Sequence, residues 1–187
     1  AMRHAVLGGG KRMRPLFACA SCEAFGGDVE PALTSGCALE FIHSYSLIHD
    51  DLPAMDDDDI RHGKPATHIA YGEANAILAG DSLHSLAFQA VVDCDTIDAH
   101  SKLSIIQLLS DAAGWAGMSG GLCLDCDADG RDLHLEELKA LHEAKTGALI
   151  RASMQIGAYR AGAQPDKSRY GALSEVGDLV GLAFQIM

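Results

Sequence analysis

The sequence predicts an all-α protein, and three observations support that prediction. Apolar residues recur at spacings of three and four in several long windows, as on one face of a helix. Strand-like alternation is almost absent, and of the five prolines only Pro53 falls inside a helical pattern. The 187 residues, 48% apolar and 21% charged, suffice for one globular domain with a sizeable core.

The elements follow from where this periodicity starts and stops. Residues 1–7, AMRHAVL, lack a capping residue and resemble the middle of a helix. Turn-forming residues mark breaks at 26–28, 61–66, 93–96, 117–132 and 163–167. We therefore expect helices at 14–24, 33–52, 73–94, 101–117, 134–162 and 168–187, joined by short connections as in a helical bundle.

Charge and cysteine usage exclude several classes of function. A formal net charge of −12 disfavours nucleic acid as a partner, because phosphate binding needs a basic face. No apolar run of 18 residues and no signal peptide is present, so we expect no membrane association. The cysteines form no dense framework and predict free thiols in a reducing, cytoplasmic setting: Cys19, Cys22, Cys37, Cys94, Cys123 and Cys126.

Both ends of the sequence have the character of chain interior. The first seven residues lack a helix start, and the last seven, GLAFQIM, lie in an apolar run without a stop signal. We therefore expect residues 1–187 to form a single all-α domain that is incomplete at both ends.

The stretch HDDLPAMDDDDIRHGKP, residues 49–65, is the strongest functional signal. Six of the ten residues from Asp50 to Asp59 are aspartates. The first two end an apolar helical run, where the negative end of the helix dipole disfavours carboxylates. A bound cation would reverse that balance, and oxygen ligands suit Mg²⁺ before Ca²⁺. With Arg61, His62 and Lys64 following, the stretch predicts a metal-bridged diphosphate site rather than a solvated acidic loop.

Helix geometry leaves the partner of Asp50 open. On a straight helix Asp56 would lie about 240° around from Asp50, whereas Asp57 would lie nearly in line with it. Pro53 prevents a straight helix, because it removes a backbone donor and clashes with the preceding turn. Either Asp56 or Asp57 can therefore meet Asp50, depending on the path of the chain between them.

Two further motifs carry positive charge inside helical patterns. GGGKRMRP, residues 8–15, is not a P-loop, yet glycines followed by three basic residues at a helix start suit an anion. HEAKTGALIRAS, residues 142–153, places Lys145 and Thr146 in a mostly apolar helix, where a lysine should have a partner. By itself the second motif favours a surface lysine beside Arg151, whose apolar stem would lie along the protein surface.

Residues 125–136, DCDADGRDLHLE, match the spelling of an EF-hand calcium loop. The eighth loop position, usually apolar, is Asp132, and the sequence holds no second such loop. We therefore expect an acidic turn between two helices, with a calcium-binding helical protein as a distant alternative.

Taken together, the motifs resemble the trans-isoprenyl diphosphate synthase (polyprenyl synthetase) family, most of all the bacterial farnesyl diphosphate synthases. The matching blocks cover essentially the whole chain: GGGKRMRP at 8–15, the run from Glu40 to His68, GEANAILAGD at 72–81, HEAKTGALIRA at 142–152 and GLAFQ at 181–185. The resemblance implies an isoprenoid-synthase-type helical bundle around a central cavity, a homodimer, and condensation of isopentenyl diphosphate with dimethylallyl or geranyl diphosphate. Its implied cofactor is Mg²⁺, with Mn²⁺ as a substitute, and its implied product is farnesyl diphosphate.

The resemblance also implies roles for particular residues. Asp50 and Asp56 correspond to metal ligands, and Tyr45 and Ser46 to the residues that limit product length. Arg61 and Lys145 correspond to catalytic contacts to the allylic diphosphate. The substrate-binding set is Lys11, Arg14, His43, Arg61, Lys145, Thr146 and Gln185.

The sequence departs from the family pattern at two positions. His62 stands where a second arginine is expected, and Leu122 stands where a glutamine is expected. The family's second aspartate-rich motif would follow GLAFQ, so we expect the protein to continue beyond Met187 and the 187 residues alone to be inactive. The alternatives are a geranylgeranyl or geranyl diphosphate synthase and a catalytically inactive helical relative that serves dimerisation.

Overall fold

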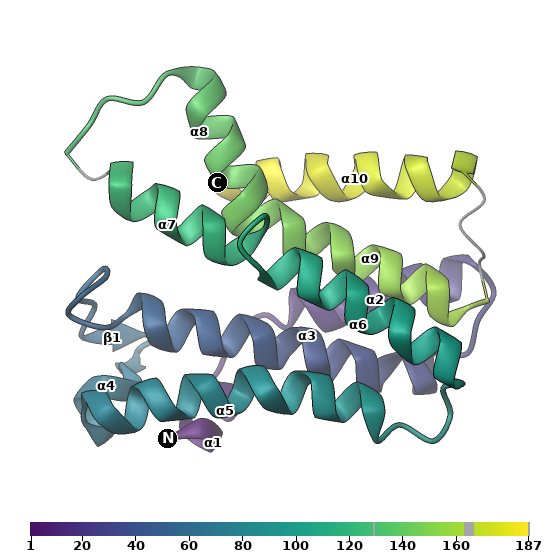
Figure 1. The fold of residues 1–187 in the computed structure, drawn as a ribbon, viewed down its shortest axis with the longest axis horizontal. Helices are drawn as coiled ribbons and strands as arrows, with labels where there is room; N and C mark the ends of the chain where they lie inside the picture. The colour runs from purple at the N-terminus through teal and green to yellow at the C-terminus, as the bar shows by residue number, and fades with distance from the viewer. Residues whose placement is uncertain (129, 163–166, 187) are drawn as a thin grey trace.

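The computed structural model describes residues 1–128, 130–162 and 167–186, and these residues are mostly helical (Figure 1). A two-stranded antiparallel ribbon is formed by β1 (Ile60–Arg61) and β2 (Lys64–Pro65). Among the described residues, no helix has the length and hydrophobicity needed to cross a bilayer. The helical elements are α1 (Met2–Leu7), α2 (Met13–Ala24), α3 (Val29–Asp50), α4 (Thr67–Tyr71), α5 (Glu73–Val92), α6 (Ala99–Ala113), α7 (Met118–Ala128), α8 (Leu135–His142), the π-helical turn η1 (Glu143–Gly147), α9 (Ala148–Arg160) and α10 (Lys167–Ile186).

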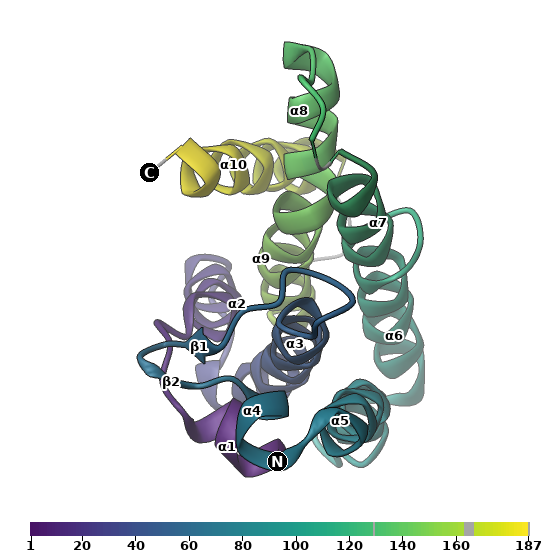
Figure 2. The same ribbon diagram turned by 90° about the vertical axis from the view of Figure 1, so that its left-hand side faces the viewer.

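Helix α3 lies in the middle of the bundle, which is the place for a helix that is apolar on most sides. In Figure 2, which views the molecule from the end that carries the hairpin, α2, α5 and α9 surround it. Its buried side chains include Leu39 and Ile42, which pack with Leu149 and Ile156 of α9 in the main core cluster. A helix buried this fully can carry its C-terminal carboxylates into the interior of the fold.

The all-α prediction is confirmed, but the predicted break at 117–132 is wrong. Helix α7 occupies most of it, and the paired glycines serve close packing rather than a turn. A Cβ atom on Gly121 would lie 2.2 Å from the backbone nitrogen of Lys145, so only glycine lets α7 approach η1 this closely.

Two other boundaries differ from the predictions. Helix α3 begins at Val29 rather than at residue 33, because the Asp28 carboxylate caps it by accepting a hydrogen bond from the Glu30 amide at 3.1 Å. The single helix predicted at 134–162 is divided by the π-helical turn η1. Most of the predicted break at 163–167, and Met187, lie outside the described residues.

The predicted break at 61–66 is the turn of the small hairpin. His62 and Gly63 both adopt left-handed backbone conformations, with φ of 52° and 75°. Two consecutive residues of this kind form the tight turn that matches the twist of a two-residue hairpin. Arg61 lies on β1, just before the turn, and His62 lies at its tip. There His62 lies close to Gly9 and Gly10, the glycines that follow α1.

Candidate functional site

The chain doubles back after α3 and places Asp56 beside Asp50. The Asp56 amide donates a hydrogen bond to the Asp50 carbonyl at 2.9 Å, and the Met55 amide donates to Leu52 at 2.8 Å. Asp57 follows in a left-handed conformation with φ of 53°. The alternative that helix geometry left open is therefore resolved in favour of Asp56 as the neighbour of Asp50.

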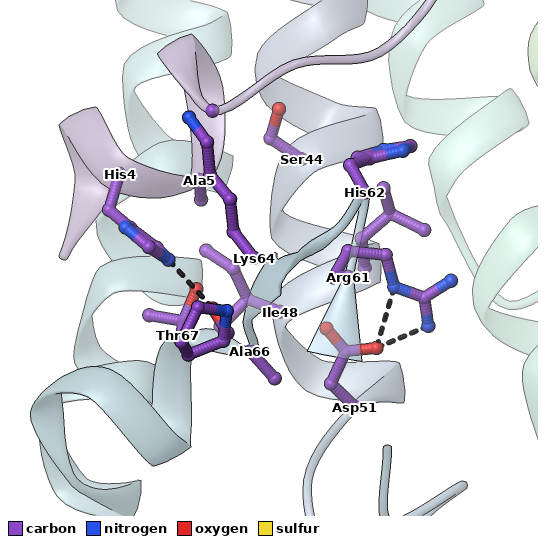
Figure 3. A pocket seen from close by; sticks show the side chains of 13 residues that line it. His4, Ala5, Ser44, Ile48, Asp51, Arg61, His62, Lys64, Ala66 and Thr67 are labelled. Atoms are coloured by element: carbon purple, nitrogen blue, oxygen red, sulfur yellow. Dashed lines mark hydrogen bonds and ion pairs between the residues drawn. The ribbon is translucent and has the colours of Figure 1, made fainter. Parts of the chain in front are cut away.

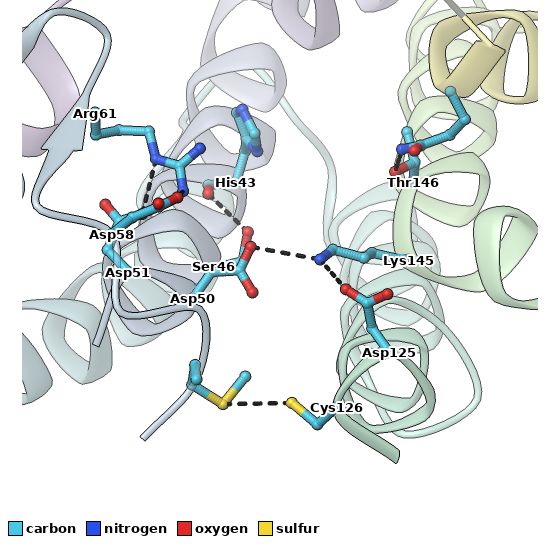
Figure 4. Close-up of polar contacts among 12 residues, drawn as sticks. His43, Ser46, Asp50, Asp51, Asp58, Arg61, Asp125, Cys126, Lys145 and Thr146 are labelled. Atoms are coloured by element: carbon cyan, nitrogen blue, oxygen red, sulfur yellow. Dashed lines mark hydrogen bonds and ion pairs between the residues drawn. The ribbon is translucent and has the colours of Figure 1, made fainter. Parts of the chain in front are cut away.

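Lys145 faces these acids from the opposite wall. Its Nζ lies 2.5 Å from Oδ2 of Asp125 on α7 and 3.5 Å from Oδ2 of Asp50 on α3 (Figure 4). An ammonium group between two carboxylates needs this company, because its side chain is only 22% exposed. The partner predicted for Lys145 therefore exists, and there are two of them, Asp125 and Asp50.

The electrostatics of this cluster are strongly coupled. Burial raises the pKa of Asp50, the positive charge of Lys145 opposes that rise, and the negative charge of Asp56 adds to it. Burial alone would lower the pKa of Lys145, but its hydrogen bond to Asp125 and the charges of Asp50 and Asp125 outweigh burial and raise it. Lys145 is therefore fixed in its charged form, while Asp50 carries a carboxylate that is costly to keep ionised.

Local backbone geometry explains why these two walls meet. Lys145 sits in the π-helical turn, an irregularity that is frequent at functional sites because it re-aims the side chains around it. Gly121 packs against that turn, and Asp125 follows it by four residues on the same face of α7. The close approach at Gly121 thus brings the Asp125 carboxylate to the Lys145 ammonium.

Arg61 lies on the other side of the aspartate-rich loop and is held by carboxylates. Its Nε donates to Oδ1 of Asp51 at 2.8 Å, its Nη2 donates to the same oxygen, and Nη2 donates to Asp58 at 3.2 Å. The hydrogen bonds that Arg61 donates to the Asp51 carboxylate raise the pKa of Arg61. Asp51 is 2% exposed, so the pair forms a fixed wall of the site (Figure 3).

A basic pocket of about 280 Å³ lies at the start of α2, next to the hairpin. It contains the predicted substrate-binding residues Lys11, Arg14 and His43, together with His62. Phe184 of α10 also lines it, and Nζ of Lys11 lies 5.7 Å from the centre of the Phe184 ring. The glycine-rich motif and the middle of α3 are therefore brought together as one concave surface.

The charges of this pocket are only partly compensated by the protein. Arg12 forms an ion pair with Glu40, a buried acid of α3. Burial lowers the pKa of Arg14 to about 10, and its Nε is shielded from solvent and has no hydrogen-bond partner among the described residues. A buried donor without a partner is costly, and an anion in the pocket would satisfy it.

His43 contributes a neutral ring to the same pocket. Burial, followed by the positive charges of Arg14, His62 and Arg12, lowers the pKa of His43 well below its ordinary value. An uncharged imidazole can donate one hydrogen bond to an anion without adding to the positive charge.

The predicted chain-length residues lie one turn below Asp50 on α3. The Tyr45 hydroxyl is 3.2 Å from the Ser119 hydroxyl of α7, and its ring makes an edge contact with His84 of α5 at 5.1 Å between centroids. Ser46 is buried and donates to the His43 carbonyl at 2.8 Å. Tyr45 thus spans from α3 to α5 and α7, beneath the cluster that contains Asp50.

Thr146 and Gln185, both predicted contacts to substrate, meet each other. The Gln185 amide of α10 donates to the Thr146 hydroxyl in η1. Thr146 is buried, and it lies next to Lys145 in the chain, so α10 supports the π-helical turn at this point. Leu122, which replaces an expected glutamine, is buried in the core instead.

The described acids contain no ready-made cage for a metal. Within the ranges that the structure describes, no three His, Cys, Asp or Glu residues converge as metal ligands. Asp56 and Asp125 do line an open cavity of about 590 Å³, which ligands can enter from solvent. The chemistry of this donor set fits a hard cation that completes its shell with water and substrate oxygens, as Mg²⁺ does.

The EF-hand reading finds little support in the structure. Its first four positions, 125–128, are the last turn of α7, and Asp125 is engaged by Lys145. A calcium loop needs those positions in an open loop with their oxygens turned inward. Asp129, the fifth position, lies outside the described residues.

Three acids that pair with basic residues of the candidate site were not singled out from the sequence. Asp125 was assigned to a turn, although its spacing of four from Gly121 is a helical signal. Asp51 was counted with the aspartates and not as the partner of Arg61. Between Val29 and Ile48 the sequence has two acids, Glu30 at the start of the helix and Glu40 in its apolar middle. An acid inside an apolar helix indicates a buried basic partner.

The chain matches known proteins over its whole length. The polyprenyl synthetase family profile matches residues 1–187. Farnesyl diphosphate synthase of Escherichia coli (strain K12) is 47% identical over 99% of this chain, and that of Geobacillus stearothermophilus is 45% identical over 100%. Geranylgeranyl diphosphate synthase of Cyanophora paradoxa is 44% identical over 100% of the chain.

Solved structures agree with these relatives. A farnesyl/geranylfarnesyl diphosphate (FPP/GFPP) synthase from Zymomonas mobilis superposes with a TM-score of 0.93 at 43% identity, over 99% of this chain and 67% of that one. A geranyltransferase from Legionella pneumophila gives 0.93 at 37% identity, over 98% of this chain and 65% of that one. The chain spans 62% of the length of the Escherichia coli relative, 63% of the Geobacillus stearothermophilus relative and 62% of the Cyanophora paradoxa relative.

Proposed function

Because the chain belongs to the polyprenyl synthetase family, we propose that the protein condenses isopentenyl diphosphate with an allylic diphosphate. One observation carries this proposal: two sites of opposite charge flank the C-terminal half of α3. The acidic mouth, defined as Asp50, Asp56, Asp125 and Lys145, suits a metal-bound diphosphate. The basic pocket around Arg14 suits a second diphosphate that needs no metal.

Asp50 and Asp56 are the residues that we expect to hold Mg²⁺ at the mouth. A bound Mg²⁺ would neutralise the leaving diphosphate and so lower the barrier to breaking the allylic carbon–oxygen bond. Lys145 would exchange its carboxylate partners for diphosphate oxygens, and as a permanent cation it would stabilise the charge that develops on them. Arg61, held in place by Asp51, would contribute from the opposite side.

The second half of the reaction needs an oriented double bond and a dry environment. Lys11, Arg14 and His43 would hold the diphosphate of isopentenyl diphosphate, which directs its double bond toward the allylic carbon. No described side chain near both sites is an obvious base, so we expect the departing diphosphate to accept the proton. The apolar side chains of α3 would exclude water, which would otherwise quench the allylic cation.

We propose farnesyl diphosphate as the product, because Tyr45 would stop a growing chain beneath the mouth. The ring is braced on two sides, by the hydroxyl of Ser119 and by the edge contact with His84. Several relatives carry the name farnesyl diphosphate synthase, which supports the assignment, and the geranylgeranyl synthases among them define the alternative.

A pair of substitutions tests this assignment of the product. Tyr45→Ala should yield products longer than fifteen carbons, since it removes the ring, whereas Tyr45→Phe keeps the ring and should retain the original product. Chromatography of the dephosphorylated products measures the lengths. Unchanged product length in Tyr45→Ala would remove Tyr45 from this role.

We also propose a homodimer in the cytoplasm. Large apolar side chains are exposed on or next to α5 and α6, and burying them against a second copy would be favourable: Leu78 (62% exposed), Leu103 (68%) and Trp115 (88%). All six cysteines are free, as expected for a reducing compartment. Sedimentation velocity of the intact protein should give twice the chain mass, and a monomer at micromolar concentration would contradict the dimer.

Incubation of the intact protein with isopentenyl and dimethylallyl diphosphates tests the activity itself. We expect consumption of both substrates with Mg²⁺, loss of activity when the metal is chelated, and release of inorganic diphosphate. An intact protein that binds both substrates and forms no new carbon–carbon bond would contradict the proposal.

A further inference from the structure

His49, the residue before Asp50 in the last turn of α3, places its ring against α5. Its Nε2 lies 3.1 Å from the Ile77 carbonyl of α5, and because a carbonyl only accepts, Nε2 carries the proton and donates the hydrogen bond. Helices α3 and α5 run side by side along this part of the bundle (Figure 1). The last turn of α3 is therefore tied to the backbone of α5.

Gly80 of α5 makes room for this ring. A Cβ atom on Gly80 would lie 2.6 Å from Cδ2 and 3.0 Å from Cε1 of His49, so the ring occupies the space that any other side chain would need. Gly80 is buried in the interior of a long helix, where glycine is otherwise unfavourable. The position of the His49 ring therefore depends on a glycine at this point of α5.

The same histidine ring contacts Tyr45, one turn earlier on α3. The centroids of these two rings are 5.7 Å apart at 78°, and the ring of His84 on α5 meets Tyr45 at 5.1 Å and 86°. Both are edge-to-face arrangements, which aromatic rings prefer. The Tyr45 ring is therefore supported from above by a ring that is itself fixed on α5 by a hydrogen bond and by the space at Gly80.

We propose that His49 is a positioning residue for product length, because it holds the ring of Tyr45 in the path of the growing chain. The proposal rests on the proposed function in one respect, since it takes Tyr45 as the residue that stops the chain. It adds that three residues make the stop: Gly80 gives the space, His49 gives the support and Tyr45 blocks the chain. His49 acts only through Tyr45 and touches no substrate.

Loss of this support should weaken the stop without abolishing it. A tyrosine side chain can turn between staggered rotamers, and the packing of its ring selects one of them. The contact of Tyr45 with His84 remains, as does the approach of its hydroxyl to Ser119 at 3.2 Å. One edge-to-face contact shifts such a choice about twofold to tenfold, so the ratio of longer products to farnesyl diphosphate should rise by about that factor.

The test is the product ratio of the intact protein, supplied with isopentenyl and dimethylallyl diphosphates and Mg²⁺ and analysed by chromatography after dephosphorylation. His49→Ala removes the support. Gly80→Ala keeps the histidine and displaces its ring, since the added methyl group would take up its space. Two substitutions serve as matched controls: His100→Ala, exposed on α6, and Gly171→Ala on α10, where nothing in the described chain lies within 4 Å of the added methyl group.

We expect His49→Ala and Gly80→Ala to raise the ratio and both controls to keep the wild-type ratio. A loss of stability alone lowers the yield of every product and leaves the ratio unchanged, so the ratio separates positioning from a merely structural role. If either variant fails to fold, His49→Gln decides, because it keeps a donor for the Ile77 carbonyl and lacks the ring; it should raise the ratio as well.

The outcomes for Tyr45→Ala separate this inference from the proposed function. Wild-type ratios in the His49 and Gly80 variants, together with longer products from Tyr45→Ala, would overturn the inference and leave the role proposed for Tyr45 standing. A wild-type ratio in Tyr45→Ala as well would overturn both roles. Absence of any product from the wild type would overturn the proposed function and this inference with it.

Discussion

The acidic mouth and the basic pocket differ in how far the protein itself satisfies their charges. At the mouth, Lys145 contacts both Asp50 and Asp125, and nearby Arg61 contacts Asp51. In the pocket, Nε of Arg14 has no hydrogen-bond partner in the part of the chain that the structure describes. Lys145 must give up carboxylate partners when the mouth binds its ligand, whereas the pocket presents Arg14 to an anion in advance.

This difference assigns different tasks to the two sites. A preorganised pocket contributes to binding, because its donors need no rearrangement when the anion arrives. A lysine that exchanges partners during the reaction contributes to the transition state, because its new contacts form as charge develops. Substitutions in the two sites should therefore separate turnover from affinity.

Lys145→Met should have the largest effect. We expect turnover to fall about 10²- to 10³-fold, because the departing diphosphate loses a fixed positive charge. Lys139→Met on α8, which removes an exposed pair with Glu136, is the control and should change little. Steady-state kinetics with both substrates measures the effect, and near-normal turnover would mean that Lys145 has only a structural role.

Arg14→Met should raise the KM for isopentenyl diphosphate about tenfold to a hundredfold with a smaller change in kcat. The physical reason is the loss of a buried, charged donor to the diphosphate. Arg3→Met, at an exposed position of α1, serves as the comparison. A fall in kcat with an unchanged KM would reverse the division of tasks between the two sites.

Asp125→Asn tests whether the partner of Lys145 matters for chemistry. We expect turnover to fall about tenfold, because Lys145 loses its nearest carboxylate and is less firmly placed beside Asp50. Asp127→Asn, on the same helix and exposed, should behave as wild type. If the two variants have the same kinetics, the contact between Lys145 and Asp125 is dispensable.

His43 should give the smallest effect, on stability. Its pKa is lowered in the folded state, so below about pH 6.5 the unfolded chain binds a proton that the folded protein refuses. Lowering the pH from 7.5 to 5.5 should therefore reduce the free energy of unfolding through this group, by an amount on the order of 1 kcal/mol. Urea unfolding at both pH values measures the change in the free energy of unfolding. His43→Gln should lose this part of the pH dependence. The same pH dependence in wild type and His43→Gln would exclude a buried neutral ring at this position.

Local patterns sufficed to predict the class of fold and most of its helices. The buried helix that ends in Asp50 could be predicted because it is apolar on nearly every side, and the cap at Asp28 only moved its start. Helix α7 could not, since Gly120 and Gly121 signal a turn by local rules, whereas in the structure Gly121 permits contact with η1. That contact joins residues distant in sequence, and no local pattern encodes it.

The candidate site divides in the same way. Lys11, Arg14 and His43 meet in one pocket as the resemblance implies, and Asp56 lies beside Asp50. The pairing of Lys145 with Asp125 and of Arg61 with Asp51 depends on the π-helical turn and the hairpin, whose backbone conformations follow from packing. Sequence reasoning therefore found the residues that touch ligands in the proposal and missed those that hold them.

The central claim is that a cation binds at the mouth and a diphosphate alone binds in the pocket. A crystal structure of the intact protein with Mn²⁺ and inorganic diphosphate, using the anomalous signal of manganese, tests it most directly. We predict manganese peaks within ligand distance of the Asp50 and Asp56 carboxylates, and a metal-free diphosphate beside Arg14. Manganese bound instead at 125–136, or no diphosphate near Arg14, would contradict the account.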